Sequence, residues 1–392
     1  MTTPPIEVEA SAGSLLGMPA AVFLRNYWQK RPLLIRQAFP GFKPPLAPED
    51  LAGLACEEGA LARLVRYDRR HDRWTLETGP FAEAVFPALP TQDWTLLVQD
   101  VDKWDADVRA LLAHFDFLPR WRIDDVMVSF AAPGGSVGPH TDHYDVFLLQ
   151  AHGRRRWQIN IAPDAPGDFR DDSELKLLRE FHPSHEFLLE PGDMLYLPPE
   201  IGHHGEAVEA CMTFSIGMRA PSQGELLGDF ADFLGERLPE TRRYADPDLG
   251  VADDPALIGT DALRRARALL ADALQQPDAV LNEWLGRFVT RYRSGGEVAA
   301  PPKPPSLAQL RQRLARGAHL VPHPFTRLAW SPDGDGRAWL FALGEAFACP
   351  PQTAQRLACG RPLGAAEFEA ADPAMQTLAL QLLAAGHLAL AR

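Results

Sequence analysis

The feature that most limits how this chain can fold is a run of short apolar segments between residues 124 and 218. Turn-forming stretches separate several of them, notably Pro133-Gly134-Gly135 and Pro191-Gly192-Asp193. The expected strands are Val126–Phe130, Tyr144–Gln150, Arg156–Ile161, Glu186–Leu189, Met194–Leu197 and Met212–Met218. Many short strands at such spacing are typical of a β-sandwich or a β-barrel.

Helical and linker patterns flank this run of expected strands. Residues 14–40 predict a helix followed by a short strand, and the apolar spacing over 222–240 and 255–293 predicts two amphipathic helices. The Gly- and Pro-rich stretch Ser294–Pro305 predicts a linker, and after it a hairpin is expected around a Pro-Asp-Gly-Asp-Gly turn, with arms Arg327–Trp330 and Ala338–Ala342. We therefore expect three parts, residues 1–220, 221–295 and 296–392.

The net charge of the chain limits the kind of macromolecule that it is expected to bind. The chain of 392 residues carries 39 Lys and Arg against 52 Asp and Glu, a net charge of −13. This balance argues against direct binding of nucleic acid, which needs a basic surface, and is compatible with a basic protein partner. No apolar run approaches the roughly 20 residues that span a bilayer. The first residues, to Gly13, do not have the pattern of a signal peptide, so we expect a cytoplasmic protein.

A possible metal site stands out in the segment from Gly138 to Asp145. On a strand, residues i and i+2 point to the same face, so His140 and Asp142 would present an imidazole and a carboxylate together. A second histidine would complete the two-histidine, one-carboxylate set that suits non-haem Fe(II) and leaves coordination positions open. His203 and His204 both follow the strand-like Met194–Leu197, and only one of them can point inward if the backbone there is extended.

These segments resemble the JmjC-type ribosomal oxygenases of bacteria. The likeness is carried by residues 133–150 (PGGSVGPHTDHYDVFLLQ), 153–157 (GRRRW), 191–199 (PGDMLYLPP) and the opening 23–35 (FLRNYWQKRPLLI). It is densest from 120 to 220. The resemblance implies an α+β fold, with a double-stranded β-helix core of the JmjC/cupin type, a helical dimerisation region and a C-terminal winged-helix-like domain.

The resemblance also implies an activity. Enzymes of this family use Fe(II), O2 and 2-oxoglutarate to hydroxylate an arginine side chain, at C3, of the sixteenth protein of the large ribosomal subunit. Transferred to this sequence, the metal ligands and catalytic residues are His140, Asp142 and His203, because the family's histidine follows Pro-Pro after three residues. His204 and His143 depart from the family pattern, which has a glutamine-like residue at the latter position.

The cosubstrate needs a cation for its far carboxylate. Strand alternation places Arg155 on the opposite face from Arg154 and Arg156, and the resemblance assigns Arg155 as the anchor, although a solvated edge or the opposite facing is also compatible with the residues. Ser129 resembles a serine of the family's cosubstrate pocket. Thr213 could add a hydroxyl there or lie at an edge.

The substrate side is less defined by the sequence. Asp125, Tyr144 and Asp145 could line a channel for a long basic side chain, and the last two could equally be structural. The expected partners are a basic ribosomal protein and a second copy of the chain, with no nucleic acid and no membrane. The alternatives are the same chemistry on a histidine or lysine of another basic protein, or a cupin-type binding protein without catalysis.

Overall fold

The computed structural model describes residues 5–10, 14–291, 298–334 and 336–391. The described residues form two compact units, one reaching to Ala220 and one from Pro221 onward. No helix among the described residues is long and apolar enough to cross a membrane.

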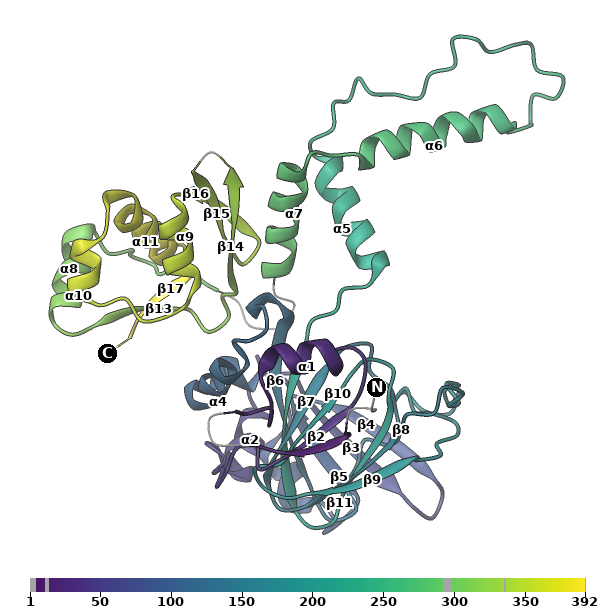
Figure 1. Ribbon diagram of the computed structural model, residues 1–392, viewed down its shortest axis with the longest axis vertical. Helices are drawn as coiled ribbons and strands as arrows, with labels where there is room; N and C mark the ends of the chain where they lie inside the picture. Colours follow the sequence, from purple (N-terminus) through teal and green to yellow (C-terminus); the bar gives the residue numbers. More distant parts are fainter. Residues whose placement is uncertain (1–4, 11–13, 292–297, 335, 392) are drawn as a thin grey trace. The chain divides into compact units, whose positions relative to one another are not determined.

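The first unit is built on two sheets (Figure 1). The large sheet has the strand order β1-β2-β10-β7-β12-β6-β5-β3-β4, and the small sheet has the order β11-β8-β9. The strands are β1 (Glu7–Glu9), β2 (Leu33–Arg36), β3 (Ala62–Asp68), β4 (Arg73–Thr78), β5 (Trp94–Val98), β6 (Ile123–Ala131), β7 (Val146–His152), β8 (Arg155–Asn160), β9 (His185–Leu189), β10 (Met194–Leu197), β11 (Gly202–Ala207) and β12 (Cys211–Met218). The helices are α1 (Ala20–Asn26), α2 (Pro48–Leu54), α3 (Val101–Trp104) and α4 (Ala106–Ala110), with 3-10 turns at Glu83–Ala88, Leu111–Phe115 and Arg120–Arg122.

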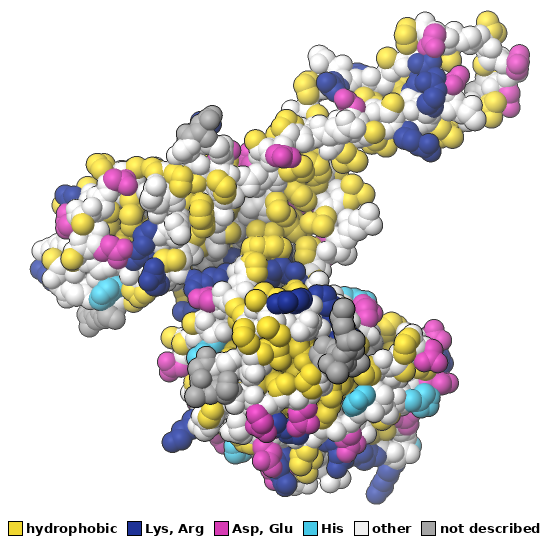
Figure 2. Space-filling model, viewed as in Figure 1, with side chains coloured by type: hydrophobic (Ala, Val, Ile, Leu, Met, Phe, Trp, Pro, Cys, Tyr) yellow, Lys and Arg dark blue, Asp and Glu magenta, His cyan; other side chains and the backbone are white. Residues whose placement is uncertain are grey.

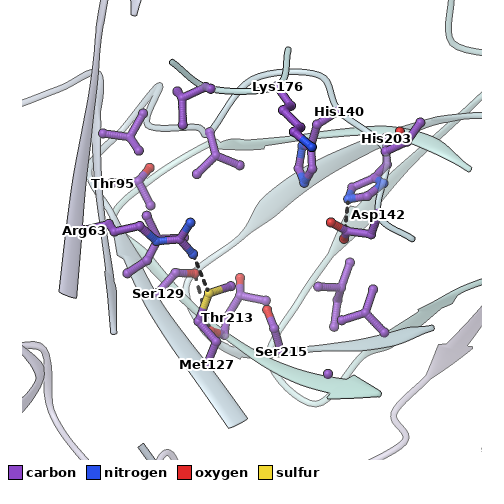
Figure 3. A pocket seen from close by; sticks show the side chains of 18 of the residues that line it. Arg63, Thr95, Met127, Ser129, His140, Asp142, Lys176, His203, Thr213 and Ser215 are labelled. Carbon is purple, nitrogen blue, oxygen red and sulfur yellow. Dashed lines mark hydrogen bonds and ion pairs between the residues drawn. The ribbon is translucent and has the colours of Figure 1, made fainter. Parts of the chain in front are cut away.

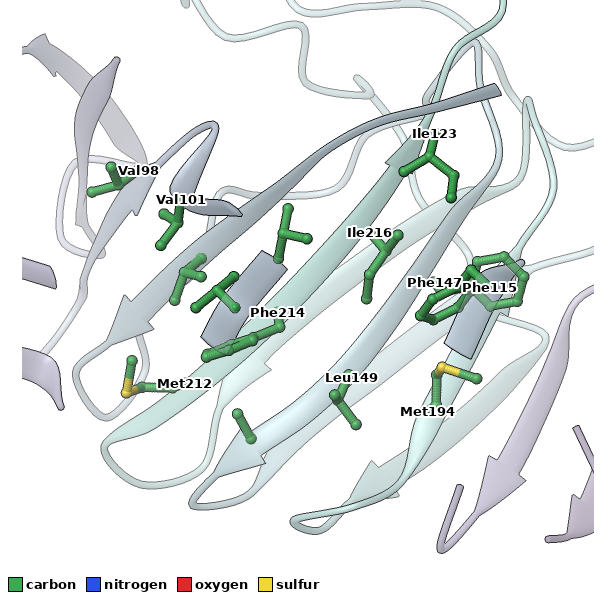
Figure 4. Close-up of a cluster of buried hydrophobic side chains, with 14 of the residues drawn as sticks. Val98, Val101, Phe115, Ile123, Phe147, Leu149, Met194, Met212, Phe214 and Ile216 are labelled. Carbon is green, nitrogen blue, oxygen red and sulfur yellow. The ribbon is translucent and has the colours of Figure 1, made fainter. Parts of the chain in front are cut away.

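Alternation along the central strands separates a dry face from a polar one. On β12, the side chains of Phe214 and Ile216 pack into the main hydrophobic core together with residues of α1 and the neighbouring strands (Figure 4). The residues that alternate with them, Thr213 and Ser215, line a cavity on the other face of the sheet. A period of two along a strand produces this division, so the same strand both anchors the core and supplies polar groups to the cavity.

The small sheet closes the cavity from the opposite side. Val146 and Leu148 of β7 form a second apolar cluster with Trp157 and Ile159 of β8. Two sheets packed face to face around a cavity are the arrangement expected for a double-stranded β-helix.

The sequence analysis missed several strands, among them β3, β4 and β11, and misplaced a helix boundary. The missed strand β11 contains both His203 and His204. The stretch 255–293 was wrongly expected to be one helix: it holds two, because Pro277 caps the second one and separates it from the first. Part of the predicted linker, residues 294–297, lies outside the described residues, and 298–305 contains no helix or strand.

The second unit begins with helices α5 (Gln223–Gly235), α6 (Thr260–Leu274) and α7 (Asp278–Thr290). Its remaining elements are α8 (Leu307–Ala315), β13 (His319–Pro322), β14 (Leu328–Gly334), β15 (Arg337–Ala342), β16 (Glu345–Cys349), α9 (Pro351–Ala358), α10 (Ala365–Ala370), α11 (Pro373–Ala385) and β17 (Leu388–Ala391). The predicted hairpin is confirmed, since β14 pairs antiparallel with β15. These elements enclose a core of their own that includes Leu340, Phe368 and Leu382.

Helix α6 differs from its neighbours because none of its residues is buried. Leu263 is 58% exposed and Leu270 is 66% exposed. Apolar side chains are visible on the surface of this part of the chain in Figure 2. A helix with uncovered leucines is unusual in a folded protein unless another surface covers it.

Candidate active site

His140 and Asp142 lie in the loop that precedes β7, rather than on a regular strand as predicted. A single antiparallel bridge holds this loop to β11: the His140 amide donates to the His203 carbonyl at 3.0 Å, and the His203 amide donates to the His140 carbonyl at 2.9 Å. Gly138 enters the loop with a φ of +79°, and a Cβ there would lie 2.6 Å from Leu177. Glycine therefore suits both the backbone and the space at this position.

The three predicted ligands converge. One ligand atom from each of His140, Asp142 and His203 lies within 4.8 Å of the other two, and His203 Nε2 is 3.7 Å from Asp142 Oδ2 (Figure 3). His140 Nδ1 donates to the Gly138 carbonyl and His203 Nδ1 to the Ile201 carbonyl, both at 2.9 Å. A carbonyl only accepts, so each Nδ1 carries a proton, and Nε2 is the nitrogen left to bind a metal.

Burial prepares His203 for this role. Burial, followed by the nearby His140, lowers the pKa of His203 to about 4. The imidazole is therefore neutral near pH 7, the form that binds a metal ion. Two imidazoles and one carboxylate on one side of an open space fit a divalent iron ion.

The neighbouring histidines are placed elsewhere. His204 is on the other face of β11, where its ring meets Phe181 edge-on at 6.2 Å. Exposed His143 contacts Glu200 through Nδ1 at 2.6 Å. Neither belongs to the converging set, so the structure favours His203 over His204 at the third position.

Beside the three residues is a cavity of about 540 Å³. Ser129 of β6 and Thr213 of β12 face each other across paired strands and both line it. The Thr213 hydroxyl donates to Gln150 Oε1 at 3.2 Å, and the Ser129 hydroxyl donates to the Thr213 carbonyl at 3.5 Å. Both predicted hydroxyls therefore lie inside the cavity.

Arg155 also lines this cavity and is 3% exposed. Its neighbours point outward, Arg154 pairing with Glu209 and Arg156 with Glu186. Arg155 Nη2 donates to the Gly205 carbonyl at 3.1 Å, while the buried Nε has no hydrogen-bond partner. Burial lowers the pKa of Arg155, and no carboxylate among the described residues pairs with it. A buried guanidinium in this state fits an incoming carboxylate.

Two of the three residues expected to line a substrate channel lie at the cavity. Asp125 and Tyr144 line the cavity. Asp145 does not: it is fully buried and accepts hydrogen bonds from Tyr196 Oη at 2.6 Å and Gln29 Nε2 at 3.0 Å. The side chain of Asp145 is therefore structural.

The cavity residues that sequence reasoning missed include Arg63, Trp157 and Lys176. Arg63 approaches Met127 Sδ at 3.7 Å, and Lys176 lies near His140 in Figure 3. Trp157 could have been found from the alternation that singled out Arg155, because it is two residues further along the same strand. Arg63 and Lys176 come from a strand that was not expected and from a loop, so no pattern pointed to them.

Comparison with known proteins agrees with this geometry. Residues 110–226 match the model of the JmjC domain family, and residues 268–389 match that of the ROXA-like winged helix. The ribosomal protein uL16 3-hydroxylase of Escherichia coli is 37% identical over 303 residues, which is 76% of this chain and 79% of that protein. The chain belongs to the family of JmjC-type ribosomal oxygenases. The predicted family and its JmjC/cupin fold with a C-terminal winged helix are thereby confirmed.

Further members of the family support the assignment. A probable ribosomal oxygenase of Haemophilus influenzae is 37% identical over 236 residues, covering 59% of this chain and 55% of that protein. The crystal structure of E. coli ycfD superimposes with a TM-score of 0.84 at 34% identity, over 96% of this chain and 99% of that one. Another structure of that ribosomal oxygenase, in complex with cobalt and 2-oxoglutarate, gives a TM-score of 0.81 at the same identity and coverage.

Proposed function

We propose that this oxygenase uses Fe(II), O2 and 2-oxoglutarate to hydroxylate an arginine side chain of ribosomal protein uL16, at C3. The observation that carries the proposal is the convergence of His140, Asp142 and His203 at a cavity whose wall contains Arg155, a buried guanidinium with no carboxylate partner among the described residues. The name of the E. coli relative gives the ribosomal protein and the carbon number. The relative bound to cobalt and 2-oxoglutarate supports the cosubstrate.

The metal, when bound with cosubstrate and oxygen, supplies the oxidising chemistry. The residues of the chain supply position. His140 and His203 are oriented by their backbone hydrogen bonds, and Asp142 adds the negative charge that favours a divalent ion. Arg155 would hold the far carboxylate of 2-oxoglutarate, and Ser129 and Thr213 line the same cavity. Val146, Leu148 and Trp157 of the second apolar cluster also line the cavity and give it an apolar wall.

A cationic substrate side chain fits the carboxylates at the cavity wall. Asp125 lines the cavity, and burial together with nearby Asp102 and Asp124 raises its pKa to about 6. A guanidinium beside Asp125 would offset the cost of ionising this carboxyl. Tyr144, 42% exposed, adds an aromatic face against which a guanidinium can stack.

The other parts of the chain receive roles from the same proposal. The uncovered leucines of α6 support a homodimer formed by the helical region 221–295. The sequence of the winged-helix-like region 296–392 has no dense basic stripe beyond Arg311, Arg313 and Arg316, so we propose a structural or substrate-docking role without nucleic-acid binding. Residues 1–220 form the catalytic domain of a cytoplasmic enzyme.

The test combines binding with turnover. The protein is loaded anaerobically with Fe(II) and 2-oxoglutarate and then given oxygen and a uL16 peptide that contains the target arginine. We expect a gain of one oxygen on arginine by mass spectrometry, with succinate formed in equal amount. Asp142→Ala should abolish both.

The matched control is His204→Ala, which removes an imidazole beside the site but on the other face of β11 and should keep metal binding. Metal and cosubstrate binding without peptide oxidation would direct the search to a histidine or lysine of another basic protein. Failure to bind metal would refute the proposal and leave the binding-protein alternative.

A further inference from the structure

Two neighbouring inward side chains of β8 each carry a donor that nothing in the described part of the protein satisfies. Arg155 is 3% exposed and Trp157 is 5% exposed, and they share one face of the strand. The buried atoms Arg155 Nε and Trp157 Nε1 both lack a hydrogen-bond partner. Buried polar groups are nearly always paired in folded proteins, so two adjacent unpaired N–H groups at a cavity indicate a ligand with acceptor atoms.

The side chains that carry the two donors are neighbours at the cavity wall. Arg155 Cζ is 5.1 Å from the centre of the Trp157 ring. The Trp157 ring is in turn 5.9 Å from that of His203, so Trp157 stands between the guanidinium and the proposed metal site. The strand register agrees, because Arg155, Trp157 and Ile159 of β8 pair with Ala207, Gly205 and His203 of β11.

Gly205 makes this arrangement possible. A Cβ at that position would lie 2.7 Å from Arg155 Nε and 2.8 Å from two carbons of the six-membered ring of Trp157. Any larger residue would therefore displace both side chains from the wall of the cavity. Arg155 Nη2 also donates to the carbonyl of Gly205, which fixes the guanidinium against the same residue.

We propose that Trp157 Nε1–H donates, together with Arg155, to the far carboxylate of 2-oxoglutarate. The absence of a side chain at Gly205 leaves the room that positions both donors. The inference rests on the proposed function and deepens it. A carboxylate has two oxygens and can accept from both N–H groups at once. A keto acid of the same length without that carboxylate would leave both donors unpaired, so the pair selects for a dicarboxylate.

The test separates the N–H group from the ring. Trp157→Phe keeps an aromatic ring and removes the donor. Binding is measured by isothermal titration calorimetry with Mn(II) in place of iron, using 2-oxoglutarate and 2-oxopentanoate, which has the same chain length but lacks the far carboxylate. Trp330→Phe, at a 39% exposed position in the other unit, is the matched control.

We expect Trp157→Phe to weaken 2-oxoglutarate about tenfold, the effect of one hydrogen bond to a charged group, and to leave 2-oxopentanoate unchanged. Gly205→Ala should weaken 2-oxoglutarate by at least as much. An equal loss of affinity for both ligands would show that the ring only packs. No loss of affinity for either ligand would show that another acceptor, such as a buried water, satisfies the donor. Both results overturn the inference. If the unaltered protein binds no 2-oxoglutarate with Mn(II), the proposed function itself fails.

Discussion

Replacing Asp145 with asparagine should destabilise the catalytic unit without harming the metal site. The carboxylate is 0% exposed and accepts from Tyr196 Oη at 2.6 Å, Gln29 Nε2 at 3.0 Å and Arg122 Nη2 at 3.3 Å. An asparagine amide offers one acceptor oxygen in place of two. In one orientation the asparagine NH2 faces the donors of Gln29 and Arg122. In the other orientation the Tyr196 hydroxyl loses its acceptor.

The magnitude follows from burial. Breaking a buried ion pair by removing one partner costs about 3–5 kcal/mol, and we expect about 3 kcal/mol because the Asn side chain keeps one acceptor. Arg122 is also 18% exposed and can recover some solvation. Tyr196→Phe removes one of the three hydrogen bonds to Asp145 and also the acceptor of the Gln29 amide, and should cost about 1–2 kcal/mol. Exposed Asp253→Asn is the control and should change the free energy of unfolding by less than about 0.5 kcal/mol.

The assay is urea unfolding followed by hydrogen–deuterium exchange of peptides from β7 and β10, which reports on the catalytic unit separately from the C-terminal one. Metal and 2-oxoglutarate affinities are measured without urea. A loss of stability below about 1 kcal/mol would refute the structural role. So would a large loss of ligand affinity at unchanged stability, because it would place Asp145 in the site.

Three further outcomes are expected. Burial, and then the charge of Asp125, raises the pKa of Asp100 from 3.8 to about 7. The folded state therefore binds this proton more tightly than the unfolded state, and the stability that the protonated carboxyl contributes is lost as the pH rises from about 4 to 7. Asp100→Asn should raise the melting temperature at pH 8 more than at pH 4. Arg155→Met should weaken 2-oxoglutarate about 100-fold by calorimetry while Mn(II) binding persists, and retained affinity would remove Arg155 as the anchor. Leu263→Glu with Leu270→Glu should convert a dimer to a monomer in sedimentation, and a monomeric unaltered protein would contradict the dimer.

The sequence predicted several of the strands that matter because their burial pattern is local. Met194–Leu197 was expected as it stands in β10, and β6 and β12 were found within a few residues of their ends. The strand β11 was missed because its residues, Gly202 to Ala207, include two histidines, two glycines and a glutamate, none of which signals a strand by itself. Pairing with β8 is what makes it one.

The candidate site shows the same division. The spacing of His140 and Asp142 singled out two candidate ligands, and the family register preferred His203. The expectation that His140 and Asp142 lie on a regular strand was wrong, because the loop meets β11 through an isolated bridge between His140 and His203. The side chain of Asp145 stands three residues from Asp142 and could not be assigned from position alone. Its role depends on Tyr196 and Gln29, which are distant in sequence.

The sequence by itself determined the chemistry this protein can offer: the histidine and carboxylate types, the arginine that alternation turns away from its neighbours, and the acidic charge. These follow from residue identity and from the period of a strand, which are local properties. Only the tertiary structure decided which donors remain unpaired at the cavity. Whether Arg155 Nε and Trp157 Nε1 are satisfied depends on every segment packed around them, and the glycine at 205 that makes room for both lies on another strand.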